Sequence, residues 1–157
     1  MPCVVDAAAA CAVEIGIMVR DPEAMLAFYR DVLGFSPHGN IIIPVGHVWG
    51  LRLGDAIVKL VYDRTVPERH NPREQATGIR YLTLRIRNVA EVYRRGLAAG
   101  HGVRKALSRF EKADGSGGAD FAILYDPDGN WIEIVEGSVW SPLEGDFSAA
   151  LGSARSA

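Results

Sequence analysis

The stretch that decides the fold is DPDGNWIEIVE, residues 126–136, in which a tight turn is followed directly by a strand. Its first five residues, DPDGN, combine the Pro, Asp and Gly that favour a sharp chain reversal. Beyond the turn, Trp131, Glu133 and Val135 alternate with isoleucines, which is the period of a β-strand with two different faces. A strand-like run over residues 121–125 precedes the turn, so the segment predicts two neighbouring strands joined by it.

The rest of the second half completes a unit around this pair of strands. Residues 79–86 alternate in the same way and predict a strand. Asn88 then stands at the N-cap position of a helix that ends at Gly100, and another strand is predicted over residues 103–107. The order of elements is therefore βαβββ.

The first half of the chain repeats this order. Residues 13–19 alternate as a strand, and Asp21 with Pro22 begins a helix that ends at Gly34. Strands are then predicted around 41–45, over 49–53 and over 56–62.

The two halves can be superimposed residue by residue. The cap residues Asp21 and Asn88 lie 67 positions apart, and the same offset places Glu14 over Tyr81. In the last strands Lys59 corresponds to Glu133 at an offset of 74, which allows an insertion in the second half. An internal duplication of this kind predicts one α+β domain built from two βαβββ modules.

The domain boundaries follow from these patterns. We expect an N-terminal extension over residues 1–12, one domain over 13–137 and a C-terminal tail over 138–157. The modules would span 13–62 and 79–137, joined by a charged loop with two prolines over 63–78.

Composition narrows the function. The chain has 157 residues, 48% of them hydrophobic, and a net charge of −2 with scattered Lys and Arg, which argues against a nucleic-acid partner. No apolar run reaches transmembrane length, and the start lacks the basic region of a signal peptide, so no membrane partner is expected. Cys3 and Cys11 form no disulfide framework, and we expect a cytoplasmic protein.

Two phrases, FYRDVLGF (residues 28–35) and DPDGNWIEIVE, make residues 13–137 resemble the vicinal oxygen chelate superfamily of glyoxalases, bleomycin-resistance proteins and extradiol dioxygenases. The resemblance implies mixed sheets curved around a cup-shaped cavity. It implies four metal-ligand positions, one seven residues before each helix cap and one in the middle of each module's last strand. It also implies a homodimer, in some members with exchanged modules, and a small-molecule substrate or ligand.

On this chain the four implied positions hold Glu14, Lys59, Tyr81 and Glu133. Glu14 and Glu133 are acceptable ligands for a hard divalent cation. Lys59 is not, because an ammonium has no lone pair, and the Tyr81 phenol is a weak ligand at neutral pH. We therefore expect that no cofactor is required, or that Mg²⁺ or Mn²⁺ is held weakly.

The same four residues predict a chemistry that does not depend on a metal. A protonated Lys59 between the two carboxylates would supply positive charge and, with Tyr81, stabilise an enolate or oxyanion. Glu14 or Glu133 would act as general base. This favours an isomerase- or lyase-type enzyme acting on an oxygenated metabolite, aromatic ones included.

Two other functions stay open. The first is a drug- or metabolite-binding protein without catalysis, of the bleomycin-resistance type, for which the four residues are an inert polar floor. The second is a divalent-metal-dependent glyoxalase or extradiol dioxygenase, against which Lys59 argues.

Four further residues are candidates for substrate binding. Trp131 shares the parity of Glu133, and Trp49 and Phe121 would add aromatic lining, although core packing remains open for Phe121. Arg85 shares a face with Tyr81, where it would pair with a substrate carboxylate.

Overall fold

The computed structural model describes residues 13–66, 78–112, 115–138 and 140. The predicted extension 1–12 with both cysteines lies outside these residues, as do most of the predicted loop 63–78 and all of the predicted tail except residues 138 and 140.

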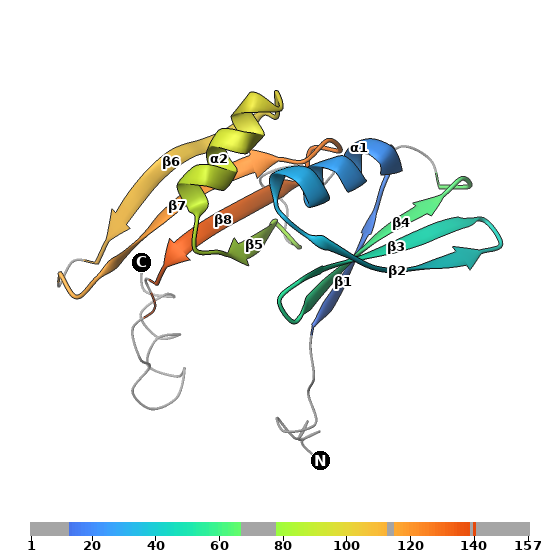
Figure 1. The fold of residues 1–157 in the computed structure, drawn as a ribbon, viewed down its shortest axis with the longest axis horizontal. Helices are drawn as coiled ribbons and strands as arrows, with labels where there is room; N and C mark the ends of the chain where they lie inside the picture. The colour runs from blue at the N-terminus through green and yellow to red at the C-terminus, as the bar shows by residue number, and fades with distance from the viewer. Residues whose placement is uncertain (1–12, 67–77, 113–114, 139, 141–157) are drawn as a thin grey trace, which may run out of the picture.

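The described chain forms two modules with the same order of elements (Figure 1). The first contains β1 (Glu14–Met18), α1 (Pro22–Ala27), the π-helix η1 (Phe28–Val32), β2 (Ser36–Ile43), β3 (Gly46–Leu53) and β4 (Ala56–Asp63). The second contains β5 (Tyr81–Arg85), α2 (Val89–Ala98), β6 (Val103–Glu111), β7 (Gly118–Tyr125) and β8 (Trp131–Gly137). The predicted α+β fold of two βαβββ modules is confirmed.

Each module builds one four-stranded mixed sheet, in the orders β1-β4-β3-β2 and β5-β8-β7-β6. The first strand of each module runs parallel to the last, while the other pairs are antiparallel. The strand register also supports the duplication, because Gly16 is the partner of Lys59 and Thr83 is the partner of Glu133. Both pairs are related by the offsets of 67 and 74 that the sequence predicts.

The two helices begin differently. The Asp21 carboxylate accepts a hydrogen bond from the Ala24 backbone N–H at 3.0 Å, as expected of an N-cap. Asn88 occupies the cap position of α2, but its side chain makes no capping hydrogen bond. The Val89 N–H instead donates to the Glu136 carboxylate of β8 at 3.2 Å, so a neighbouring strand supplies this cap.

Several strands are longer than predicted. β2 begins at Ser36, and the hairpin of β6 and β7 extends to the pair Glu111–Gly118. These segments are polar or glycine-rich, so the alternation that identifies strands is absent, and cross-strand pairing alone keeps them extended. In the described part of the chain, no helix has the length and apolar character needed to cross a membrane.

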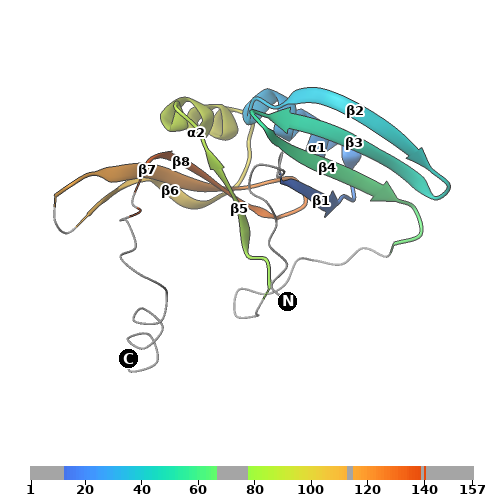
Figure 2. The same ribbon diagram turned by 90° about the horizontal axis from the view of Figure 1, so that it is seen from below.

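Both modules share one hydrophobic core. Figures 1 and 2 show α1 and α2 side by side, with the two sheets extending away from them. Each helix packs on one face of its sheet, and the cluster between them joins residues from both modules, among them Met25, Phe28, Tyr29, Leu60, Leu124, Ile132 and Ile134. The opposite faces carry Glu14 and Lys59 on the first sheet and Tyr81 and Glu133 on the second. We call them the first and second open faces.

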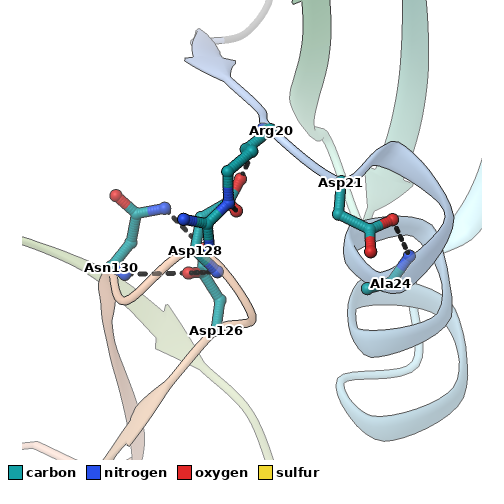
Figure 3. Close-up of polar contacts among 6 residues, drawn as sticks. All are labelled: Arg20, Asp21, Ala24, Asp126, Asp128 and Asn130. Carbon is teal, nitrogen blue, oxygen red and sulfur yellow. Dashed lines mark hydrogen bonds and ion pairs between the residues drawn. The ribbon is translucent and has the colours of Figure 1, made fainter. Parts of the chain in front are cut away.

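The DPDGN turn connects the modules through a buried carboxylate. Asp126 is only 3% exposed, and its Oδ1 accepts hydrogen bonds from the backbone N–H groups of Asp128 (3.0 Å) and Asn130 (2.8 Å). Its Oδ2 accepts the Asn130 side-chain amide at 2.7 Å and the Tyr29 hydroxyl of η1 at 3.4 Å. Asp128 in turn accepts the Arg20 backbone N–H at 2.8 Å (Figure 3).

We expect Asp126→Ala to lower the free energy of unfolding by about 2–4 kcal/mol, because two backbone N–H groups and the Tyr29 hydroxyl lose their acceptor inside the fold. Asp126→Asn, which keeps one oxygen for the backbone donors, should cost less. Urea unfolding monitored by circular dichroism measures both. Asp31→Ala is the control, since Asp31 is exposed and pairs only with its neighbour Arg30. Equal losses for Asp126→Ala and Asp31→Ala would contradict the role of the turn.

Burial raises the pKa of Asp126 above its usual 3.8, with the nearby Asp128 adding to the rise and the hydrogen bonds from Asn130 opposing it. A carboxyl with a raised folded-state pKa contributes stability below its unfolded pKa and loses that contribution as the pH rises through the folded-state pKa. The free energy of unfolding of the wild type, relative to Asp126→Asn, should therefore fall as the pH is raised from about 3.8. A relative stability that increases over this range would refute the assignment.

Candidate functional site

The first open face holds an ion pair at its centre. The Lys59 ammonium lies 3.0 Å from Oε2 of Glu14, and the two side chains are 40% and 46% exposed. The register partners of Lys59 on both neighbouring strands are glycines, Gly16 of β1 and Gly50 of β3. The space over Gly16 is empty, whereas the His38 ring lies over Gly50. A small molecule lying on this face can therefore reach the ammonium from the β1 side.

The second open face holds a hydroxyl–carboxylate pair at the corresponding place. Thr83 donates its hydroxyl hydrogen to Oε2 of Glu133 at 2.7 Å. Tyr81 is the register partner of Trp131 one step along the same strands, and it is 47% exposed. The carboxylate is therefore oriented by a neutral donor on the adjacent strand, and a phenol and an indole lie next to it.

The structure does not gather the four predicted residues into one cluster within a single chain. Glu14 and Lys59 are paired on the first sheet, and no hydrogen bond or ion pair among the described residues joins them to Tyr81 or Glu133 on the second. A pocket of about 970 Å³ lies between β1 and β5, and its lining includes Tyr81 and Trp131 but neither Lys59 nor the two glutamates. The pairs belong to separate faces.

The donor set does not fit a tightly held transition metal. Lys59 stands at one of the implied ligand positions, and its ammonium is already in contact with the Glu14 carboxylate, where a second cation would be repelled. Within the ranges that the structure describes, no three His, Cys, Asp or Glu side chains are grouped to hold an ion.

The predicted substrate-binding residues divide between the two sides of the sheets. Trp131 and Phe121 lie on the second open face, because Phe121 pairs with Val135 two residues beyond Glu133. Arg85 is on the same face and donates to the Gly137 carbonyl. Trp49 pairs with the fully buried Leu60 and therefore lies on the helix side of the first sheet, stacked on His47 at 4.3 Å.

Three residues of the second open face were not identified from the sequence. Thr83 follows from the duplication, because it is the counterpart of Gly16 beside the last strand. Arg80 and Arg104 place their guanidinium carbons 5.6 Å and 4.7 Å from the Trp131 ring centroid. Arg104 was missed because the register of β6 shifts between Val103 and Lys105, which breaks the alternation.

Comparisons with known proteins agree with this architecture. Residues 12–134 match the model of the family described as the Glyoxalase/Bleomycin resistance protein/Dioxygenase superfamily. A search of curated proteins found no match.

Three solved structures illustrate the similarity of fold. A glyoxalase family protein from Enterococcus faecalis is 22% identical, with a TM-score of 0.58, and the match covers 81% of this chain and 96% of that one. Lactoylglutathione lyase from Agrobacterium tumefaciens is 23% identical, with a TM-score of 0.55 and coverage of 83% and 96%. A glyoxalase I mutant from Zea mays is 17% identical, with a TM-score of 0.63, and the match covers 78% of this chain and 43% of that one.

We expect Lys59→Met and Glu133→Gln to change the free energy of unfolding by less than about 1 kcal/mol each, because exposed ion pairs contribute little and Gln retains an oxygen for Thr83. Leu60→Ala is the matched control for Lys59, since Leu60 is adjacent but fully buried and should lose about 2–5 kcal/mol. Thermal and urea unfolding measure all three. A loss for Lys59→Met as large as that for Leu60→Ala would mean that Lys59 supports the fold.

Proposed function

The chain belongs to the Glyoxalase/Bleomycin resistance protein/Dioxygenase superfamily, and on this premise we propose that it is a cytosolic enzyme that performs acid–base chemistry on a small oxygenated metabolite. The observation that carries the proposal is the ion pair of Lys59 and Glu14, which fill the two implied ligand positions of the first module. In the second module, Glu133 fills one implied position and pairs with Thr83. Isomerase or lyase chemistry suits these groups, because proton transfer needs a base and a stabilised oxyanion but no redox centre.

The contacts distinguish the roles of the two glutamates. Glu14 is occupied by the Lys59 ammonium, so it serves to hold that cation in place. Among the described residues, Glu133 pairs with the neutral hydroxyl of Thr83, which orients it without neutralising its charge, so it is the proposed base. Lys59 and the Tyr81 hydroxyl would donate hydrogen bonds to the enolate or oxyanion that forms when Glu133 removes a proton.

The residues must meet for this chemistry, and a homodimer provides the arrangement. The helices hold the two sheets side by side with their open faces outward, and both faces expose apolar side chains. Examples are Met18 (50% exposed), Ile41 (59%), Tyr81 (47%) and Phe110 (52%). A second copy placed with its second open face over the first would cover these side chains and close a cup between Lys59 and the partner's glutamate.

The second candidate function is ligand binding without turnover, favoured by the exposed Tyr81 and the half-buried Trp131 beside Glu133. It differs from the first only in the absence of product. The third candidate, a metal-dependent glyoxalase or dioxygenase, is separated from both by elemental analysis. If the protein retained stoichiometric Zn, Ni or Fe through dialysis, the metal would supply the positive charge that is assigned here to Lys59.

Mixing two inactive variants tests the chemistry and the assembly together. Each variant, Lys59→Met and Glu133→Gln, should lower kcat/KM by about a hundredfold or more, because each removes a group that acts in the transition state. The assay uses a substrate identified from a panel of α-hydroxy and α-keto compounds that includes lactoylglutathione. In a module-exchanged heterodimer, one cup carries both substitutions and the other carries neither. Unfolding and refolding an equal mixture should therefore restore about a quarter of wild-type activity.

The control is Lys59→Met unfolded and refolded alone, because none of its dimers contains an unaltered cup. Failure of the mixed variants to recover activity, with each variant alone inactive, would place the complete site within one chain. If each variant alone turned over substrate as fast as the wild type, the proposed chemistry would be refuted.

A further inference from the structure

The described side chains of the second open face carry a net positive charge, although the chain as a whole has a net charge of −2. Among the described residues on this face, four cationic side chains accompany a single carboxylate, that of Glu133. The cationic side chains are Arg80, Arg85, Arg104 and Lys105. The first open face is balanced by comparison, because Lys59 and Arg52 share it with Glu14 and Asp63. The excess of positive charge is thus concentrated around one carboxylate.

Two of these cationic side chains make cation–π contacts with the same ring, that of Trp131. The guanidinium groups of Arg80, just before β5, and Arg104, on β6, both lie over the indole of Trp131. Cation–π contact uses the flat face of a guanidinium, and an arginine has five N–H donors around its edge. Both arginines have further partners in the fold, and with five donors each guanidinium can hold these partners and an oxyanion together. Trp131, two residues before Glu133 on the same face of β8, thus contacts both guanidinium groups.

The backbone of β6 is irregular where it presents these charges. Val103 pairs with Leu124, on the helix side of the sheet, while Lys105 pairs with Ile123, which is the partner of Glu133 on the open face. The register shift between them allows both Arg104 and Lys105 to reach the open face, whereas a regular strand would send one of them to the helix side. Bulges commonly re-aim side chains in this way beside functional sites.

There is room for an apolar group next to the cations. Arg80, Tyr81 and Trp131 also line the pocket of about 970 Å³ between β1 and β5, whose other walls include Ile17 and Met18. Pockets that bind small molecules are of this size and combine an apolar wall with a few polar groups.

From these observations we infer that the ligand of this face is an oxyanion, a carboxylate or a phosphate carried on a flat apolar body. Arg104 and Arg80 bind the anion, and Trp131 and Tyr81 contact the body. The inference rests on the proposed function, because it names the class of ligand that the same face presents to Glu133. It assigns recognition to the arginines and leaves proton removal to Glu133 and stabilisation of the resulting oxyanion to Lys59.

Calorimetric titration of the full chain with three matched compounds tests the inference. Phenylacetate and phenyl phosphate carry an oxyanion, and phenylacetamide is the neutral counterpart of phenylacetate. We expect at least one of the two oxyanions to bind at least about tenfold more tightly than the amide. Its affinity should fall when NaCl is raised from about 50 to about 500 mM, whereas the affinity for the amide should not change. Tighter binding of phenylacetate identifies a carboxylate ligand, and tighter binding of phenyl phosphate identifies a phosphate ligand.

Arg104→Gln should reduce the affinity for the preferred oxyanion by about tenfold or more and leave the amide unchanged. The matched control is Arg94→Gln, which removes an exposed arginine that pairs with Glu91 on α2, away from this face. Equal affinities for oxyanion and amide, no saturable binding of either oxyanion, or equal effects of the two arginine variants would each overturn the inference. These titrations measure binding without turnover. The activities of the Lys59 and Glu133 variants therefore test only the proposed chemistry and not the ligand class.

Discussion

The carboxylate of Asp126 is the contact on which the rest of the structure depends. It closes the turn between β7 and β8 by accepting two backbone N–H groups, and it receives the Tyr29 hydroxyl from the first module. Burial raises the pKa of Tyr29 well above 10, and the nearby Asp126 adds to the rise, so the phenol keeps its proton and remains a donor. Asp128 of the same turn holds the backbone of Arg20, where β1 leads into α1. These contacts fix the modules side by side over one core, and that placement turns both open faces away from the helices.

The parallel pairing of first and last strands then decides which side chains meet. In each module this pairing places the third residue of the first strand beside the middle of the last strand. Gly16 therefore flanks Lys59, and Thr83 flanks Glu133. The same backbone position thus leaves the β1 side of an ammonium open in one module and orients a carboxylate in the other. Equivalent positions of the two modules therefore carry side chains of opposite charge, Lys59 and Glu133.

The parts of this arrangement that follow from period and offset could be predicted from the sequence. Strand alternation and the offsets of 67 and 74 predict that Glu14 corresponds to Tyr81 and Lys59 to Glu133, while the family resemblance implies that these four face inward. Trp49 could not be placed in the same way, since its face depends on the pairing of β3 with β4 rather than on its own strand. Arg104 depends on a register shift, and the cap of α2 depends on Glu136 from a distant strand. Contacts of this kind arise only when strands come together, so local patterns carry no trace of them.

Exposure explains why the proposed chemistry would require the two open faces to come together. In the single chain Lys59 and Glu14 are 40% and 46% exposed, and water at that level screens most of the field of an ammonium. A second open face laid over them would exclude that water, and the positive charge of Lys59 would then act strongly on an oxygen held nearby. The excess of arginines on the second face fits the same logic, because an anionic ligand held by Arg104 compensates the charge that would otherwise be buried with it. Ligand and partner face are thus each favoured by the presence of the other.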